Sequence, residues 1–261
     1  MAARGRQVEN MVMLIILSSM LRVPIRADPE TKLLYYQCNY SPSSNATRFE
    51  QILNAALASV VKEVGASGFA TAEEDASTGT ATDSVVVLAQ CRKDKSPADC
   101  VDCIKVAGNQ ARSCASESCK AYYDGCYLRY ENYNFSDTYT DATHRALCGQ
   151  ANAPDSSSFS ATGRTLISDL CTATPLIKDY FAADTRQGPS NTTIYGLAFC
   201  LSSIQRNSCQ DCLKIAQENI IKCFPRSDGR AIDVGCYLRY DSKPFFPSNA
   251  TTYLTPFLPT G

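Results

Sequence analysis

The apolar pattern first becomes regular between Phe49 and Val64. Apolar residues recur there at i, i+3, i+4 and i+7, which is the spacing of one face of a helix. The sequence Thr47-Arg-Phe-Glu50 matches a capping box just before the run. An amphipathic helix is therefore predicted to begin near Thr47 and to end at Gly65.

A second helix is predicted after Ser96, because this N-cap residue is followed by Pro97 at the first helical position. One face of it carries Cys100, Cys103, Ile104, Ala107, Ala111 and Cys114. Strand patterns rich in β-branched and aromatic residues occur in Lys32–Cys38, Ser84–Cys91 and Tyr122–Tyr130, and more weakly in Gly68–Ala72. Residues 73–82 are predicted to form a polar loop. This order predicts an α+β module in which two helices cover an antiparallel sheet.

The whole pattern recurs 109 to 110 residues later, so the chain contains an internal duplication. The first copy contains Cys38 and then Cys91-x8-Cys100-x2-Cys103-x10-Cys114-x11-Cys126-Tyr-Leu-Arg-Tyr. The second contains Cys148 and then Cys200-x8-Cys209-x2-Cys212-x10-Cys223-x12-Cys236-Tyr-Leu-Arg-Tyr. In the second copy, the first helix is predicted around Phe159–Leu170, interrupted by Gly163 and Pro175.

The N-terminus is predicted to be a secretory signal peptide. Arg4 and Arg6 precede the apolar run Met11–Leu21, and Ala27 offers a cleavage point. An uncleaved anchor is the alternative, but the run is too short to span a bilayer comfortably. No second apolar run reaches transmembrane length, so we expect no transmembrane segment in the mature chain.

Charge and sequons agree with export. Without its first 27 residues the chain has a net charge of about −4, which argues against a general nucleic-acid or anionic-membrane binder. N-glycosylation sequons occur at Asn45, Asn134, Asn191 and Asn249.

Cys-x2-Cys on a helix has three interpretations. A zinc site needs four ligands per module, yet the chain has one histidine, His144. A redox pair is expected in a βαβ context and usually in the cytosol. The third interpretation, two halves of different structural bridges, is favoured because cysteine-dense modules need an oxidising compartment. We therefore expect no metal and no cofactor.

The Cys-x8-Cys-x2-Cys core followed by Gly-Cys-Tyr-Leu-Arg-Tyr resembles the ginkbilobin-homologous, or stress-antifungal, domain of land plants. Tandem copies occur in cysteine-rich repeat secretory proteins, plasmodesmata-located proteins and ectodomains of cysteine-rich receptor-like kinases. The resemblance covers essentially the whole mature chain. It divides the chain into a signal peptide (1–27), domain 1 (28–135), a linker (136–147), domain 2 (148–246) and a tail (247–261).

The resemblance also implies a disulfide pairing, which spacing alone leaves open among many connectivities. The implied bridges are Cys38–Cys114, Cys91–Cys100 and Cys103–Cys126 in module one, and Cys148–Cys223, Cys200–Cys209 and Cys212–Cys236 in module two. Each module is thus expected to be stapled by three disulfides. Cys119 and Cys171 have no partner in the repeat. They would either bridge the two domains, or Cys171 would be a buried apolar thiol and Cys119 free or paired with another chain.

A binding site is implied in the same way. In mannose-binding, antifungal members of this family, the sugar is held by an Asn just after the first cysteine, an Arg six residues before the last and a Glu five after it. The matching residues are Asn39, Lys120 and Glu131 in module one, and Gly149, Arg230 and Asp241 in module two. Lysine lacks the bidentate fork of arginine, and Gly149 lacks an amide, so module one is the predicted mannose-type site.

Aromatic residues crowd the last strand of module one: Tyr122, Tyr123, Tyr127, Tyr130, Tyr133 and Phe135. Strand alternation directs half of them into the core. The outward half is predicted to form either further packing, a stacking platform for a sugar or a protein contact.

The sequence contains no catalytic motif that would indicate an enzyme. His144 and the Glu73-Glu74 pair are interpreted as ordinary surface residues. The predicted function is a secreted, carbohydrate-binding defence protein of the apoplast with antifungal activity. The alternative is a protein-interaction module, similar to a receptor-like kinase ectodomain, that binds an extracellular partner or receptor in stress signalling. A redox sensor that uses Cys119 or Cys171 is a third hypothesis.

Overall fold

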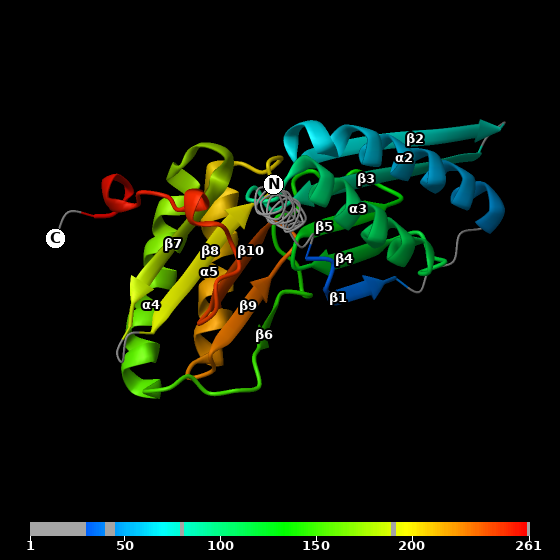
Figure 1. The fold of residues 1–261 in the computed structure, drawn as a ribbon. Helices are drawn as coiled ribbons and strands as arrows, with labels where there is room; N and C mark the ends of the chain where they lie inside the picture. Colours follow the sequence, from blue (N-terminus) through cyan, green and yellow to red (C-terminus); the bar gives the residue numbers. More distant parts are fainter. Residues whose placement is uncertain (1–29, 40–44, 79–80, 189–191, 260–261) are drawn as a thin grey trace, which may run out of the picture.

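Two modules of the same topology lie side by side in the computed structural model (Figure 1). The structure describes residues 30–39, 45–78, 81–188 and 192–259. The predicted signal peptide and the sequon at Asn191 lie outside these residues. In the described part of the chain, no helix is both long and apolar enough to cross a membrane.

Module one is a five-stranded antiparallel sheet with strand order β1-β4-β5-β3-β2 and two helices packed against it. The strands are β1 (Leu33–Cys38), β2 (Phe69–Thr78), β3 (Ala81–Cys91), β4 (Cys119–Tyr123) and β5 (Cys126–Glu131), and the helices are α2 (Ala46–Ser67) and α3 (Pro97–Arg112).

Module two repeats this arrangement with strand order β6-β9-β10-β8-β7. Its strands are β6 (Arg145–Cys148), β7 (Phe181–Gln187), β8 (Thr193–Cys200), β9 (Asp228–Ile232) and β10 (Cys236–Asp241), and its helices are α4 (Ser156–Ala173) and α5 (Arg206–Ile220). Short 3₁₀ turns are η1 (Thr174–Leu176), η2 (Lys178–Tyr180), η4 (Ile221–Cys223), η5 (Ser248–Ala250) and η6 (Thr255–Phe257). The two sheets confirm the predicted α+β fold and its duplication.

The single strand predicted at Tyr122–Tyr130 is wrong. The segment is a hairpin in which β4 ends at Tyr123, Asp124 and Gly125 form the turn, and β5 begins at Cys126. Asp-Gly is a frequent hairpin turn, but here the flanking strands are both almost wholly buried. Neither strand therefore shows the alternation of apolar and polar residues that would indicate where the first ends and the second begins.

The polar loop predicted at residues 73–82 is also wrong. β2 continues to Thr78 and β3 starts at Ala81, so residues 73–78 and 81–82 belong to the paired strands of a long antiparallel hairpin. β2 is an edge strand, and an edge strand keeps polar side chains on its solvent side, so composition alone suggested a loop.

Helix α2 is longer than predicted at both ends. The side chain of Asn45, rather than Thr47, caps the helix by accepting a hydrogen bond from the Arg48 amide (3.2 Å). The helix passes Gly65 and stops at Gly68, whose φ of 74° gives the left-handed C-cap.

Gly163 does not interrupt α4, contrary to the prediction. It packs against the ring of Phe224, where an added Cβ would lie 2.6 Å from ring atoms. The glycine is needed there for the close approach of a ring rather than for a turn. Pro175 lies beyond the helix, within η1.

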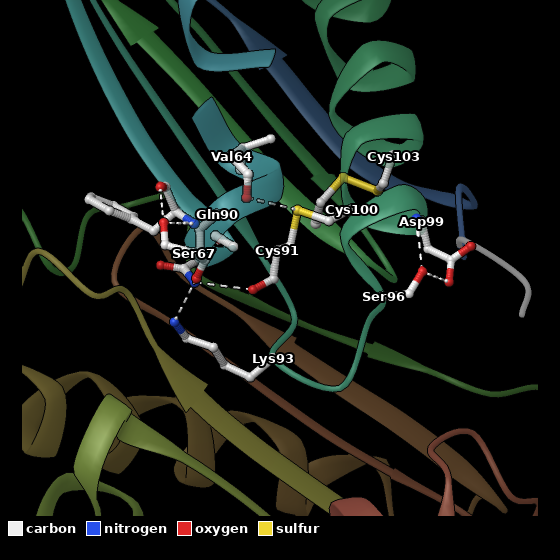
Figure 2. The surroundings of a disulfide bond; sticks show 12 residues. Val64, Ser67, Gln90, Cys91, Lys93, Ser96, Asp99, Cys100 and Cys103 are labelled. Carbon is white, nitrogen blue, oxygen red and sulfur yellow. Dashed lines mark hydrogen bonds between the residues drawn. A yellow bond between two sulfur atoms is a disulfide. The ribbon is translucent and has the colours of Figure 1, made fainter. Parts of the chain in front are cut away.

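The six disulfides have the pairing that the family resemblance implies. The Cys-x2-Cys motif is explained by the register of β3 and β5, in which Cys91 lies opposite Cys126. Cys100 bonds to Cys91 (Figure 2). Cys103, one turn further along α3, bonds to Cys126. Two successive turns of one helix are thus fixed to two neighbouring strands.

The faces of the two sheets that point away from their helices pack against each other. Leu88, Tyr122, Tyr127 and Phe135 of module one belong to the same buried cluster as the core of module two. The outward half of the predicted aromatic row is therefore mostly buried between the modules, and Tyr133 is the member that stays exposed, at 54%.

A buried charge network lies at this contact, centred on Asp124 in the β4–β5 turn. Arg230 donates two hydrogen bonds to its carboxylate, from Nε to Oδ1 (2.6 Å) and from Nη2 to Oδ2 (3.0 Å). The Tyr237 hydroxyl donates a third at 2.8 Å, and Arg239 Nη1 lies 3.5 Å from Oδ1. Burial alone would raise the pKa of Asp124, but these hydrogen bonds and cations outweigh it and hold the pKa below its usual value.

Cys119 and Cys171 are free thiols, each buried in a different module, and do not bridge the domains. Burial, assisted by the charge of Glu131, raises the pKa of Cys119 to about 12, and burial also raises the pKa of Cys171. Both sulfurs are therefore protonated and shielded at neutral pH.

We expect the native protein to react with no equivalent of an aromatic disulfide reagent at pH 7, and with two after unfolding in denaturant without reductant. Absorbance of the released thiolate measures both values. A thiol that reacts quickly in the native protein would contradict this expectation and would favour the redox-sensor hypothesis.

Candidate functional site

Asn39, Lys120 and Glu131 line one pocket of about 370 Å³ in module one. They come from three adjacent strands, because Asn39 follows β1, Lys120 lies in β4 and Glu131 ends β5. The register places Lys120 opposite Gln37 of β1 and Arg129 of β5. The antiparallel pairing thus brings together three residues that lie up to 92 positions apart in the sequence.

The other residues of this pocket are also mostly polar: Gln37, Glu117, Ser118, Asn132 and Tyr133. Sequence reasoning had named Tyr133 in the aromatic row, as a residue for packing, sugar stacking or a protein contact, and missed the other four. Asn132 and Tyr133 directly follow Glu131, and Gln37 is two positions before Asn39, so proximity in the chain was the available signal. Glu117 lies in the loop before β4, where it accepts a hydrogen bond from Asn132 Nδ2 (2.7 Å), and no sequence pattern indicates it.

The Glu131 carboxylate is held in place by Arg129, whose Nε donates to Oε1 at 2.8 Å. The Arg129 guanidinium in turn lies 4.1 Å from the centre of the Phe135 ring. Glu131 is only 3% exposed, so its orientation is fixed. A carboxylate has about four lone-pair positions, so it keeps capacity to accept further hydrogen bonds from a ligand.

Lys120 forms an ion pair with Asp141 of the linker between the modules. Burial would raise the pKa of Asp141, but hydrogen bonds from Lys120 and Thr143 lower it below its usual value. The backbone amide of Asp141 donates to Asp233 of module two (3.2 Å). The linker therefore connects the cation of the pocket to module two, and the ammonium keeps other N–H donors for a ligand.

The matching residues of module two are used differently. Arg230 is bound to Asp124 across the module contact and to Asp228 (3.0 Å). An added Cβ at Gly149 would lie 1.9 Å from Asp228 Oδ1, so a larger side chain there needs Asp228 to move. Asp241 accepts a hydrogen bond from Arg239 at 3.1 Å. In module one, the cation Lys120 lines the pocket that would bind a ligand. The equivalent cation of module two, Arg230, binds Asp124 of module one instead.

A second pocket, of about 780 Å³, adjoins the first and shares Gln37 and Asn39 with it. The Cys38–Cys114 disulfide forms part of its wall, and the Cys119 thiol lies 2.8 Å from Cys114 Sγ. Among the described residues, these three sulfurs are the one group with metal-ligand spacing, and the disulfide consumes two of them.

The sequon asparagines Asn45, Asn134 and Asn249 are exposed and thus accessible to glycosylation, which stays a prediction. His144 is exposed, and its Nδ1 lies 2.7 Å from the Asp141 carbonyl oxygen.

Known proteins share this sequence pattern and fold. The family model described as salt stress response/antifungal matches residues 37–133 and 147–243. Cysteine-rich receptor-like protein kinase 2 of Arabidopsis thaliana is 30% identical over 236 residues, which cover 89% of this chain and 35% of the kinase. The chain thus spans about a third of that relative's length.

Two further comparisons extend along most of both proteins. An antimicrobial ginkbilobin-2-like protein of Castanea crenata is 28% identical over 90% of this chain and 95% of its own length. The solved tandem DUF26 ectodomain of the Arabidopsis thaliana cysteine-rich receptor-like protein PDLP8 superposes with a TM-score of 0.65 at 22% identity. This match covers 81% of this chain and 98% of that one. At this identity the superposition shows the fold alone.

Proposed function

This chain belongs to the salt stress response/antifungal family, and from this membership we propose that it is a non-enzymatic, mannose-type carbohydrate-binding protein of plant defence. It acts in the apoplast and has antifungal activity through the glycans that it binds. The relative with an antimicrobial name, which it matches over nearly full length, supports this proposal.

The observation that carries the proposal is the gathering of Asn39, Lys120 and Glu131 in one polar pocket. Sugar hydroxyl groups both donate and accept hydrogen bonds. A carboxylate accepts, an ammonium donates, and an amide does both, so the three side chains complement a neutral polyol. Because Arg129 and Asp141 hold two of these side chains, the site loses little conformational entropy when a ligand binds.

The test is the affinity of the refolded mature chain for mannose-type glycans, compared between the wild type and Asn39→Ala. Asn39 is exposed, and its backbone amide, which donates to Ser118 O (3.1 Å), is kept in the variant, so the fold is expected to survive. Loss of one or two side-chain hydrogen bonds is expected to weaken binding about tenfold.

Asn207→Ala is the matched control, because Asn207 is an exposed asparagine on α5 of module two. Its affinity is expected to equal that of the wild type. Equal affinities in Asn39→Ala and the wild type would show that the sugar binds elsewhere.

A second candidate function is a protein-interaction module like the extracellular part of a receptor. Its support is the identity of 30% with a receptor-like kinase, together with the engagement of Lys120 and Glu131 by other residues of this chain. The same experiment separates the two functions. A wild-type protein that binds no glycan favours an extracellular protein partner.

A further inference from the structure

A further pocket of module one, of about 160 Å³, lies between the two helices and the sheet. Its residues come from the first half of α2, the end of α3 with the loop after it, and β5: Ala46, Phe49, Glu50, Leu53, Arg112, Ala115, Ser116 and Tyr130. It shares no residue with the pocket of Asn39, Lys120 and Glu131. The function proposed above therefore makes no use of this site.

Two buried aromatic rings form the inner wall of this pocket. Phe49 of α2 and Tyr130 of β5 are 6% and 0% exposed, and their ring centres lie 6.2 Å apart at an angle of 50°. The Tyr130 hydroxyl donates to the carbonyl oxygen of Ser116 (2.8 Å), which fixes the ring. Small-molecule sites are typically walled by apolar and aromatic side chains with a few polar groups, as this pocket is.

Module two contains the same pair of rings in nearly the same geometry. Phe159 and Tyr240 are the repeat counterparts of the two rings, and their centres lie 6.3 Å apart at 57°. A third ring completes this cluster. Phe224 stacks on Tyr240 with ring centres 4.3 Å apart at 13°, and its centre lies 6.1 Å from that of Phe159. Module two therefore shows which group this pair of rings accommodates.

Module one has alanine in the place of the third ring. Ala115 corresponds to Phe224, because each directly follows the fifth cysteine of its module. Leu53 corresponds to Gly163, which packs against the Phe224 ring, so leucine takes part of the ring's space and about 160 Å³ remains. An apolar cavity of about 150 Å³ is large enough to bind benzene. The remaining space thus suits one aromatic ring.

Both modules also place a guanidinium at this position. In module two, the Arg164 guanidinium lies 5.3 Å from the centre of the Phe224 ring. The counterpart of Arg164 is Asn54, whose Oδ1 accepts a hydrogen bond from Arg112 Nε at 2.6 Å. Arg112 is thereby held at the pocket, and a cation there attracts the face of an electron-rich ring. Glu50 also lines the pocket, so the two charges balance and favour a neutral ligand.

We propose that this pocket binds a small, neutral, monocyclic aromatic molecule such as a substituted phenol. Its ring stacks on Tyr130 beside Phe49, as Phe224 does on its own pair, and the Arg112 guanidinium lies over the outer face. A free molecule is the expected occupant, because the rim residues Ala46 and Ala115 present little surface for a docked protein. A stable protein interface usually buries about 800 Å² on each partner.

The test is a titration of the refolded mature chain with 4-fluorophenol, followed by ¹⁹F NMR. Saturable binding at one site per chain is expected, with a Kd of about 1 mM or below. Phenol is expected to displace the probe. Cyclohexanol has the same number of heavy atoms but no aromatic face, and it is expected to displace the probe about tenfold less well.

Two variants locate the site. Leu53→Phe places a ring of the chain itself in the pocket and is expected to weaken the binding of 4-fluorophenol at least tenfold. Arg112→Gln removes the cation from an exposed position and is expected to weaken it about fivefold. Arg206→Gln is the matched control, because Arg206 is an exposed arginine on α5, and its Kd is expected to equal that of the wild type. Melting temperatures no lower than that of the wild type would show that the variants are folded.

The possible outcomes separate this inference from the proposed function. A wild type that shows no saturable binding of 4-fluorophenol would overturn the inference. Equal affinities in the wild type, Leu53→Phe and Arg112→Gln would also overturn it, because the phenol would then bind elsewhere. Tighter displacement by N-acetyltyrosine amide than by phenol would overturn it in favour of a tyrosine side chain of a partner protein. The glycan affinity of Asn39→Ala tests the proposed function independently, and this variant is expected to bind 4-fluorophenol as the wild type does.

Discussion

Replacing Asp124 by alanine is expected to lower the free energy of unfolding by about 3 kcal/mol. The carboxylate accepts hydrogen bonds from Arg230 and Tyr237 and lies near Arg239, and all four groups are buried. Its removal leaves two cations without the anion that they share. The expected loss is at the lower end of the range for breaking a buried ion pair, because Arg230 still has its hydrogen bond to Asp228 and Arg239 still has its hydrogen bond to Asp241.

Denaturant unfolding followed by tyrosine fluorescence, with the disulfides intact, measures this change. Asp211→Ala is the control, because Asp211 is an exposed aspartate on α5, and a change within about 0.5 kcal/mol is expected there. A loss below about 1 kcal/mol in Asp124→Ala would mean that Asp124 contributes little to holding the modules together.

The free energies of unfolding of the wild type and of Asp124→Ala should depend differently on pH. The pKa of Asp124 is lowered in the folded state, so its contribution is complete above the unfolded value of about 3.9 and is lost as the pH falls through the folded value. The stabilities of the wild type and Asp124→Ala are therefore expected to converge below about pH 4. Asp233, whose pKa is raised by burial, acts in the opposite direction in both proteins and cancels in the comparison.

When the Cys38→Ala variant is refolded with oxidised glutathione, which takes up the two electrons and two protons, Cys114 and Cys119 are expected to form a new disulfide. The Cys119 sulfur already lies 2.8 Å from Cys114 Sγ, so a small movement brings the pair to bonding distance. The native bridge joins residues 76 positions apart, and the new one joins residues five apart. In the chain-entropy model these loops contribute about 4.5 and about 2 kcal/mol, so the expected net loss is about 2–2.5 kcal/mol.

Cys148→Ala provides the matched control within the same chain. It breaks the equivalent bridge of module two, Cys148–Cys223, but the position that corresponds to Cys119 is Gly229. Cys223 then stays a thiol, and about 4.5 kcal/mol is lost.

Peptide mapping without reductant and thiol counts in denaturant distinguish the two variants. One thiol, Cys171, is expected in Cys38→Ala, against three in Cys148→Ala. Three thiols in both variants would show that Cys119 does not replace Cys38.

The two helices of module one could be predicted from the sequence because their burial is one-sided. α2 and α3 each bury one face, which leaves a helical period that can be recognised in the chain. The hairpin at Asp124 was missed for the opposite reason. β4 and β5 are buried on both faces, one against helices and the other against module two, so neither strand alternates. Packing between domains leaves no periodic signal of its own.

The residues of the candidate site could also be predicted only in part. Family positions indicated Asn39, Lys120 and Glu131, and they do share a pocket. The same rule matched Arg230 to the cation position of module two, and this residue is bound to Asp124, 106 positions earlier in the sequence. Asp141 likewise reaches Lys120 from the linker. No local pattern predicts either pair, because each depends on how the two modules are oriented.

The position of Asp141 has a consequence for how the two modules respond to a ligand. Its carboxylate holds Lys120, and its backbone amide holds Asp233 of module two. A ligand that draws the Lys120 ammonium toward itself competes with the Asp141 carboxylate of the linker. Its binding free energy therefore includes the cost of weakening the Lys120–Asp141 ion pair. Thermodynamic reciprocity then requires that any partner which tightens the two modules against each other weakens this ligand by the same factor. A ligand that binds at Lys120 would thereby be coupled, through Asp141, to the contact between the two modules.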